Sequence, residues 1–300
     1  MKNPRPIRNI LEYAAARLAF AAFRVMPLRL AAWMGESLGL LFFHLLKNRR
    51  EIAVAQLRES LAVEPKEARA IARRAFRHLG LCFAESARLH RWTPENVARD
   101  VDLGDAPERF AAVLAEGKGA IFVGAHYGNW EASNVLGAIL GVSVAGVARS
   151  LDNPYLDRYV HRLRERPGYE IWTKAGFLRK SLRALRDGKA FGLLADQDAG
   201  PRGVPVVFFG RTASMTPMPA ELAVKTGAAV IAVALRRLGP MRFVFRMAEP
   251  LRADGNADPE AEVGRLSQAL ASDLEGFIRE TPEQWLWLHR RWKSTPQEAR

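Results

Sequence analysis

Apolar runs of strand length alternate with amphipathic helical segments over most of the chain. The clearest example is the apolar run 120–123, which is followed by glycines at 124 and 128 and then by a helical pattern that continues to Leu140. Short apolar runs bounded by glycine are typical of buried strands, whereas apolar positions three and four apart indicate a helix. Further strands are predicted at 142–148, 169–172, 190–194, 204–209, 228–235 and 242–247. The alternation predicts an α/β fold with a central, mostly parallel or mixed sheet of about seven strands, covered by helices.

The N-terminal segment 7–46 is apolar but is repeatedly interrupted by charged residues. Its longest uncharged piece, 37–46, has ten residues, whereas a membrane-spanning helix needs about twenty. We therefore expect one or two helices with broad apolar faces that carry aromatic residues such as Trp33 and Phe42. Arginines beside such a face suit a helix that lies in a lipid interface, and the alternative is that the face packs on the protein's own core. The sequence thus divides into membrane-associating helices at 1–46 and a main domain at 47–300.

The charge balance narrows the classes of partner. Forty-five Lys and Arg residues against 32 Asp and Glu residues give a net charge of +13. Such an excess favours a polyanion, whether nucleic acid, an anionic membrane surface, a phosphorylated substrate or an acidic protein. The basic residues are scattered over many predicted helices without a nucleic-acid-binding motif, so we expect no nucleic acid partner. Cys82 is the single cysteine, which excludes an intrachain disulfide and is typical of a protein that faces the cytoplasm.

Candidate chemistry lies where the first predicted strand turns into its helix. His126 follows the strand end, and Glu131 falls in the first turn of the helix. A carboxylate that binds one imidazole nitrogen fixes the tautomer and makes the other nitrogen a better base. The pair therefore predicts a general base that takes a proton from a hydroxyl or amine as it attacks a carbonyl. The alternative is a polar turn whose histidine is satisfied by backbone groups.

A second group of polar residues, Asp196 to Asp198, follows the predicted strand 190–194. The carboxyl ends of strands are where open α/β sheets place functional groups. The six histidines show no metal-ligand spacing, so we expect no metal and no cofactor, and a metal hydrolase built on His126 and Glu131 is disfavoured.

In their order along the chain, these motifs resemble those of the late (lauroyl/myristoyl-type) acyltransferases of lipid A biosynthesis, within the lysophospholipid-acyltransferase superfamily. That family carries a histidine, four residues and then an acidic residue, which here are His126 and Glu131. The other matching segments are 147–149 with 153–154 and 157, Arg164, 196–198, 200–203, 207–210, 226–229 and 282–293. The likeness covers most of 45–295. The first motif alone is a weak signal, but the ordered set is specific to the family.

The resemblance implies a reaction and a place in the cell. An acyl chain would pass from an acyl carrier protein thioester to a hydroxyl of a phosphorylated lipid A precursor, often one bearing Kdo sugars. The enzyme would sit at the cytoplasmic face of the bacterial inner membrane, with an acyltransferase domain at 47–300. The main alternative is another glycolipid or phospholipid acceptor, such as a phosphatidylinositol mannoside. Glycerolipid acyltransferases of the superfamily usually carry a Glu-Gly-Thr-Arg motif, which this chain lacks.

The resemblance also implies roles for particular residues. His126 would be the general base and Glu131 its orienting partner. The residues implied for substrate binding are Arg149, Arg164, Asp196 and Asp198. Arg164 is expected to differ from Arg158, Arg162 and Arg166, which repeat every four residues and so share one helix face.

Overall fold

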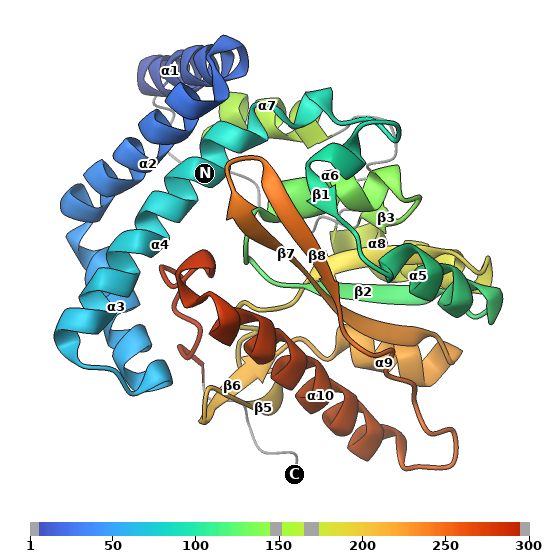
Figure 1. The fold of residues 1–300 in the computed structure, drawn as a ribbon. Coiled ribbons are helices and arrows are strands. Elements are labelled where there is room, and N and C mark those ends of the chain that lie inside the picture. Colours follow the sequence, from blue (N-terminus) through green and yellow to red (C-terminus); the bar gives the residue numbers. More distant parts are fainter. Residues whose placement is uncertain (1–5, 145–151, 165–173, 295–300) are drawn as a thin grey trace.

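The computed structural model of the 300-residue chain describes residues 6–144, 152–164 and 174–294 (Figure 1). The chain begins with the helices α1 (Pro6–Val25), α2 (Leu28–Leu45), α3 (Lys47–Leu61) and α4 (Pro65–Ser86). The later helices are α5 (Ala106–Ala115), α6 (Trp130–Ile139), α7 (Pro154–Arg164), α8 (Lys174–Arg186), α9 (Met218–Thr226) and α10 (Pro259–Glu280). Figure 1 shows α1 to α4 along one side of the molecule, beside the sheet and its covering helices.

Within the described residues the central sheet has six strands, in the order β1-β8-β7-β2-β4-β3. They are β1 (Val101–Asp102), β2 (Ala120–Gly124), β3 (Ser143–Val144), β4 (Ala190–Leu194), β7 (Ala229–Gly239) and β8 (Arg242–Met247). β2 lies at the centre and pairs in parallel with both β4 and β7, whereas β7 and β8 are antiparallel. The predicted α/β class and mixed sheet are therefore confirmed.

The predicted count of about seven strands in one sheet is not confirmed, and one strand was assigned to the wrong sheet. The segment predicted at 204–209 forms β5 (Val204–Phe208), which pairs antiparallel with β6 (Arg211–Met215) in a separate two-stranded sheet. Phe209 and Gly210 between them both have positive φ, 53° and 68°. Two such residues make the tight turn that folds a strand back on its neighbour. The strand predicted at 169–172 lies outside the described residues.

The side chains of β2 alternate between two apolar layers. Ile121 and Val123 belong to a core cluster that includes residues of α8, α9 and α10, whereas Ala120 and Phe122 pack in a cluster with Val113 of α5. Successive side chains of a strand point to opposite faces, so a strand with helices on both faces is apolar throughout. Figure 1 shows α10 crossing one face of the sheet. This sandwiching fixes β2, and with it the position of the corner that follows.

Helix α2 lies unusually close to α4. The contact is made by Gly35 and Gly39 on α2 and Gly80 on α4, and a Cβ at Gly80 would come within 2.0 Å of the Gly35 carbonyl oxygen. Only glycine allows two backbones to approach in this way. The predicted domain boundary falls at Leu46, the residue between α2 and α3.

The N-terminal helices also present apolar side chains to solvent. They include Leu11 and Leu18 of α1, and Trp33 and Phe42 of α2. None of the helices in the described ranges combines the length and the apolarity needed to cross a membrane.

The close packing of α2 on α4 gives a first prediction. We expect Gly80→Ala to lower the free energy of unfolding by about 1–3 kcal/mol, because the added methyl group forces the two helices apart. Denaturant unfolding followed by circular dichroism measures this change. Gly276→Ala in α10 is the matched control, since a Cβ at Gly276 would meet no described atom within 4 Å. The control should gain stability by up to ~1 kcal/mol from helix propensity, and equal effects at both positions would contradict the prediction.

Candidate active site

The corner between β2 and α6, residues 125–129, is built for a sharp change of direction. Gly128 has a φ of +58°, and a Cβ at this position would lie 1.8 Å from the carbonyl oxygen of Leu235, so only glycine fits. Asn129 then caps α6, because its side-chain oxygen accepts a hydrogen bond from the backbone N–H of Ala132 (3.2 Å). The corner therefore places His126 just past the carboxyl end of β2.

The neighbouring strand β4 ends at the same level. Gly124 of β2 is in register with Leu194 of β4, and the backbone N–H of Ala195 donates to the Gly124 carbonyl oxygen (3.1 Å). Because the two strands are parallel, the residues that follow them emerge at one edge of the sheet. Asp196 is thereby brought beside His126, although 70 positions separate them in the chain.

His126 and Asp196 make a two-point contact. Nδ1 of the imidazole lies 2.7 Å from Asp196 Oδ1, and the backbone N–H of His126 donates to Oδ2 (2.8 Å). An ionised carboxylate accepts hydrogen bonds only, so Nδ1 carries the proton and Nε2 carries the lone pair. Nε2 lies 3.5 Å from Nε2 of the exposed Gln197, and the imidazole ring packs at a centroid distance of 5.3 Å from Trp130. The arrangement holds the tautomer that a general base requires.

Asp196 stays ionised although it is buried. Burial by itself raises the pKa of a carboxyl group, but attraction to His126 and hydrogen bonds from His126 and Trp285 lower the pKa of Asp196 to about 2. The Trp285 bond runs from its indole N–H to Oδ2 (2.8 Å). A permanently charged carboxylate on Nδ1 stabilises the imidazolium that forms when Nε2 takes up a proton.

The carboxylate on Nδ1 is thus Asp196, a residue that the sequence assigned to substrate binding. Glu131 lies in the first turn of α6, where it is half-buried, and its role in orienting His126 remains a prediction. Asp198 accepts hydrogen bonds from the backbone N–H (3.2 Å) and the hydroxyl (2.9 Å) of Ser294. Its backbone N–H also donates to Nε2 of His289 (3.2 Å). The structure therefore joins Asp198 to the C-terminal segment, and its role in substrate binding remains a prediction.

The two arginines predicted for substrate binding are placed only in part. Arg149 lies outside the described residues. Arg164 is the last residue of α7, and its side chain is outside the described part of the chain. Arg158 and Arg162 of the same helix are exposed, in agreement with the expectation of a solvated face.

Trp285 is the site residue that sequence reasoning missed. Its segment, 282–293, was matched only as a family motif, without a role for the indole. Besides the bond to Asp196, Trp285 pairs with Tyr127 in an antiparallel bridge, and the next residue, Leu286, donates its N–H to the His126 carbonyl oxygen (3.0 Å). The C-terminal segment therefore holds both members of the histidine–aspartate pair.

An apolar cavity adjoins this edge of the sheet. Gly124 and Leu194, the last residues of β2 and β4, form part of its wall. From there it extends between the sheet and the helices α5 and α6, and it is lined by Phe110, Phe122, Leu136, Val233, Phe245 and Met247, among others. A wall of this composition suits a hydrocarbon chain. In the parts of the chain that the structure describes, no three His, Cys, Asp or Glu side chains are grouped so that they could hold a metal ion.

A histidine held by a buried carboxylate, beside an apolar cavity at the carboxyl edge of a mixed sheet, is compatible with an enzyme that transfers acyl groups. Comparison with known proteins gives the same class. The profile of the bacterial lipid A biosynthesis acyltransferases matches residues 5–294, and the chain belongs to this family.

Individual relatives fall into two groups. The chain is 26% identical to the lipid A biosynthesis lauroyltransferase of Escherichia coli K12, over 88% of this chain and 85% of that protein. It is 28% identical to a phosphatidylinositol mannoside acyltransferase of Mycobacterium tuberculosis, over 74% of this chain and 70% of that protein. The predicted family and the assignment as an acyltransferase are confirmed, and both groups act in glycolipid biosynthesis.

The low pKa of Asp196 predicts how stability depends on pH. Its folded-state pKa of about 2 is below the ordinary value of 3.8, so the ionised form adds stability above pH ~4 that is lost as the pH falls toward 2. We expect the stability advantage of the wild type over Asp196→Asn to shrink by about 2 kcal/mol between pH 5 and pH 2. Denaturant unfolding at several pH values measures it. The exposed Asp187→Asn serves as control, and a pH-independent difference for Asp196→Asn would refute the assignment.

Proposed function

We propose that this protein transfers a fatty acyl chain from an acyl carrier protein thioester to a hydroxyl of a phosphorylated lipid A precursor of the Kdo-lipid IVA type. The single observation that carries the chemistry is the contact of His126 Nδ1 with the buried Asp196 carboxylate. Family membership supports the acceptor class.

The proposed reaction uses His126 as its general base. Nε2 takes the proton of the acceptor hydroxyl as the hydroxyl oxygen attacks the thioester carbonyl carbon. The carbon–sulfur bond then breaks, and the carrier thiolate leaves and takes up the proton from the imidazolium. Asp196 stabilises the imidazolium throughout, and Glu131 is the second carboxylate that we assign to the orientation of His126. The thioester already has a good leaving group, so no covalent acyl-enzyme is needed.

The apolar cavity supports a hydrocarbon substrate. Each methylene group that leaves water contributes about 0.8 kcal/mol, so a long acyl chain gains most of its binding energy from such a wall. The cavity begins at Gly124, two residues before the base. A chain seated there would have its carbonyl end near His126 Nε2.

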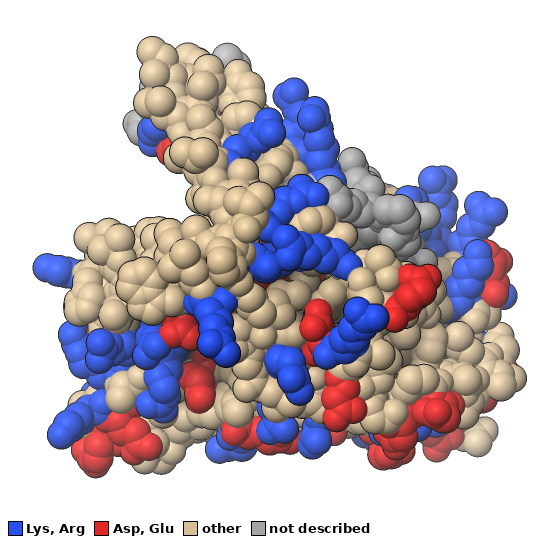
Figure 2. All heavy atoms as spheres, turned by 45° about the horizontal axis from the view of Figure 1, so that its top comes forward, with Lys and Arg blue, Asp and Glu red and all other residues tan. Residues whose placement is uncertain are grey.

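The N-terminal helices support work at a lipid surface. Figure 2 shows uncharged surface over the protruding N-terminal helices, with Lys and Arg side chains close below it. Exposed Leu11, Leu18 and Trp33 lie on these helices, and Arg29 and Lys47 nearby are also exposed. An apolar face flanked by cations binds anionic lipid from one side of the membrane. We therefore propose peripheral association of residues 1–46 with the cytoplasmic face of the bacterial inner membrane.

A second acceptor is favoured by the other group of relatives. The mycobacterial acyltransferases that this chain resembles are named for phosphatidylinositol mannoside, and they are 28% identical to it. The chemistry at His126 would be the same, and only the sugar that offers the hydroxyl would differ. Mass spectrometry of lipid A from cells with and without the protein separates the two: a missing acyl chain supports the lipid A acceptor, and unchanged lipid A rejects it.

The roles assigned to His126, Asp196 and Glu131 predict losses of kcat of different size. We expect His126→Ala to lower kcat by about 10²–10⁴-fold, because the general base is removed. Asp196→Asn should lose about as much, since an amide cannot hold Nδ1 protonated and support the imidazolium. Glu131→Gln should lose less if Asp196 is the main orienting carboxylate. Steady-state rates of acyl transfer from acyl carrier protein, measured on folded variants, rank these losses of kcat. Wild-type turnover of a folded His126→Ala enzyme would refute the role of His126 as general base.

The arginines of α7 give a separate prediction about acceptor binding. Arg164 lies two residues beyond the exposed Arg162, which places it about 160° around the helix from Arg162. We expect Arg164→Ala to lower kcat/KM by at least about tenfold, with Arg164→Lys only a partial rescue if the contact to phosphate is bidentate. Arg158→Ala is the control, and its small effect should fade as the salt concentration rises. Equal losses at both positions would mean that α7 contributes only a diffuse basic surface.

A further inference from the structure

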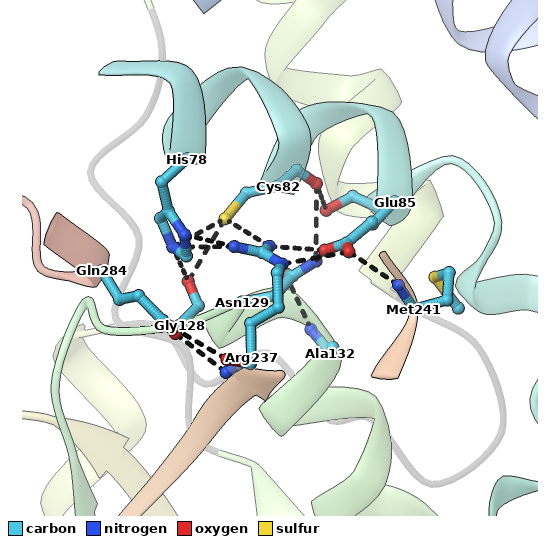
Figure 3. A network of polar contacts seen from close by, with 10 residues as sticks. His78, Cys82, Glu85, Gly128, Asn129, Ala132, Arg237, Met241 and Gln284 are labelled. Atoms are coloured by element: carbon cyan, nitrogen blue, oxygen red, sulfur yellow. Dashed lines mark hydrogen bonds and ion pairs between the residues drawn. The ribbon is translucent and has the colours of Figure 1, made fainter. Parts of the chain in front are cut away.

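Behind the corner at 125–129 lies a group of buried polar side chains that the proposed reaction does not use (Figure 3). At its centre, Glu85 of α4 and Arg237 of β7 form an ion pair at 2.5 Å, with side-chain exposures of 1% and 6%. Cys82 and His78 of α4 lie about one and two turns before Glu85 on the same helix, and both contact the Arg237 guanidinium. We call these four residues, together with Gln284, the corner network.

The ion pair is fully hydrogen-bonded and reaches the corner directly. Oε1 of Glu85 accepts from Arg237 Nε (3.1 Å) and from the backbone N–H of Met241 (2.9 Å). Oε2 accepts from Arg237 and from the side-chain amide of Asn129 (2.9 Å). Asn129 is the residue that caps α6, so its position is set on one side by the helix and on the other by the Glu85 carboxylate.

Gly128 is held by both of its backbone polar groups. Its carbonyl oxygen accepts from His78 Nε2 (2.9 Å) and from the Cys82 thiol (3.2 Å), and its N–H donates to the Gln284 carbonyl oxygen (3.0 Å). The Gln284 side chain in turn pairs with the backbone N–H (2.8 Å) and carbonyl (2.9 Å) of Arg237. Helix α4 and the segment before Trp285 thus bind these two corner residues directly, and β7 supports both of them through Arg237.

The protonation states fit these bonds. Burial, with the nearby Arg237 charge, lowers the pKa of His78 well below its usual value, so the imidazole is neutral, donates from Nε2 and accepts the guanidinium at Nδ1. Burial also raises the pKa of Cys82 to about 11, so the thiol keeps the proton that it donates to Gly128.

We propose that Glu85, Arg237 and His78 are positioning residues for acyl transfer: they fix Gly128 and Asn129 and thereby hold His126 against Asp196. The hydrogen bonds described above run from these residues to the backbone of the corner, to Asn129 and to one another. This inference rests on the proposed function, because acyl transfer is the reaction that these residues would support. A buried ion pair gives little net stability relative to apolar side chains. We therefore assign this pair the role of fixing the positions of the corner residues. Displacing a catalytic group by about 1 Å can cost as much as 10²-fold in rate.

The test separates geometry from stability. In the double variant Glu85→Leu/Arg237→Met, apolar side chains replace the pair and no buried charge is left alone. We expect it to fold with a lowered Tm, because the Met241 N–H and the Asn129 amide lose their acceptor, and to have kcat lowered about 10–100-fold with KM little changed. Hydrogen exchange of the backbone amides at 128–132, followed by mass spectrometry, should become at least about tenfold faster, because Asn129 loses its Glu85 acceptor and the side chains that bind Gly128 lose their contact with Arg237.

A matched pair on α10 serves as control. Glu262 is also a buried carboxylate, and it also binds an arginine, Arg265, together with a backbone N–H, that of Asp254 (2.8 Å). Glu262→Leu/Arg265→Met should leave kcat and exchange at 128–132 unchanged. A folded Glu85→Leu/Arg237→Met enzyme with wild-type kcat and wild-type exchange overturns the proposal.

His78 provides a second test that leaves the ion pair intact. His78→Leu removes the donor to Gly128 and should lower kcat about tenfold, whereas His78→Gln can donate to Gly128 and accept from Arg237 and should restore most of it. Equal activity of the two variants counts against the proposal. If the wild type transfers no acyl group but exchange at 128–132 still responds to the network variants, the proposed function fails and the positioning of the corner stands.

Discussion

The hydrogen bond between His126 and Asp196 is the contact on which the site depends, and the sheet makes it possible. β2 and β4 are parallel neighbours in register, so their last residues lie side by side and the segments that follow them meet. The carboxylate then satisfies the imidazole, a backbone N–H and the Trp285 indole at once. A buried charge is tolerated here because each of its oxygens is occupied.

Helix α4 contacts both the N-terminal helix α2 and the corner at 125–129. On one side its Gly80 meets the backbone of α2, whose far surface is apolar and exposed. On another side it carries Glu85 and the other α4 residues of the corner network. The element proposed to lie on the membrane and the corner that holds the base are therefore attached to one rigid helix. This arrangement would keep the proposed base, His126, at a fixed height above the lipid surface on which we propose the enzyme works.

The stability and the chemistry of this protein draw on different interactions. The core clusters on both faces of β2 are apolar and account for folding in the usual way. Five of the buried polar side chains, Glu85, Asn129, Asp196, Arg237 and Gln284, lie around residues 126–129, where they bind backbone groups and one another. Such fully satisfied networks rigidify a local structure, which suits the general-base role that we propose for His126.

The sequence by itself determined the α/β class, the corner after β2 and the histidine at that corner, because these follow from local patterns of apolar residues and glycines. It also placed Asp196 at a strand end. Only the tertiary structure decided that Asp196 binds Nδ1 and that Trp285 holds it, since these contacts join residues 70 and 89 positions apart. Strand order and the path of the C-terminal segment create them, and periodicity carries no information on either. For the same reason the sequence put 204–209 in the main sheet: its apolar pattern predicts a strand but does not name the strand's partner.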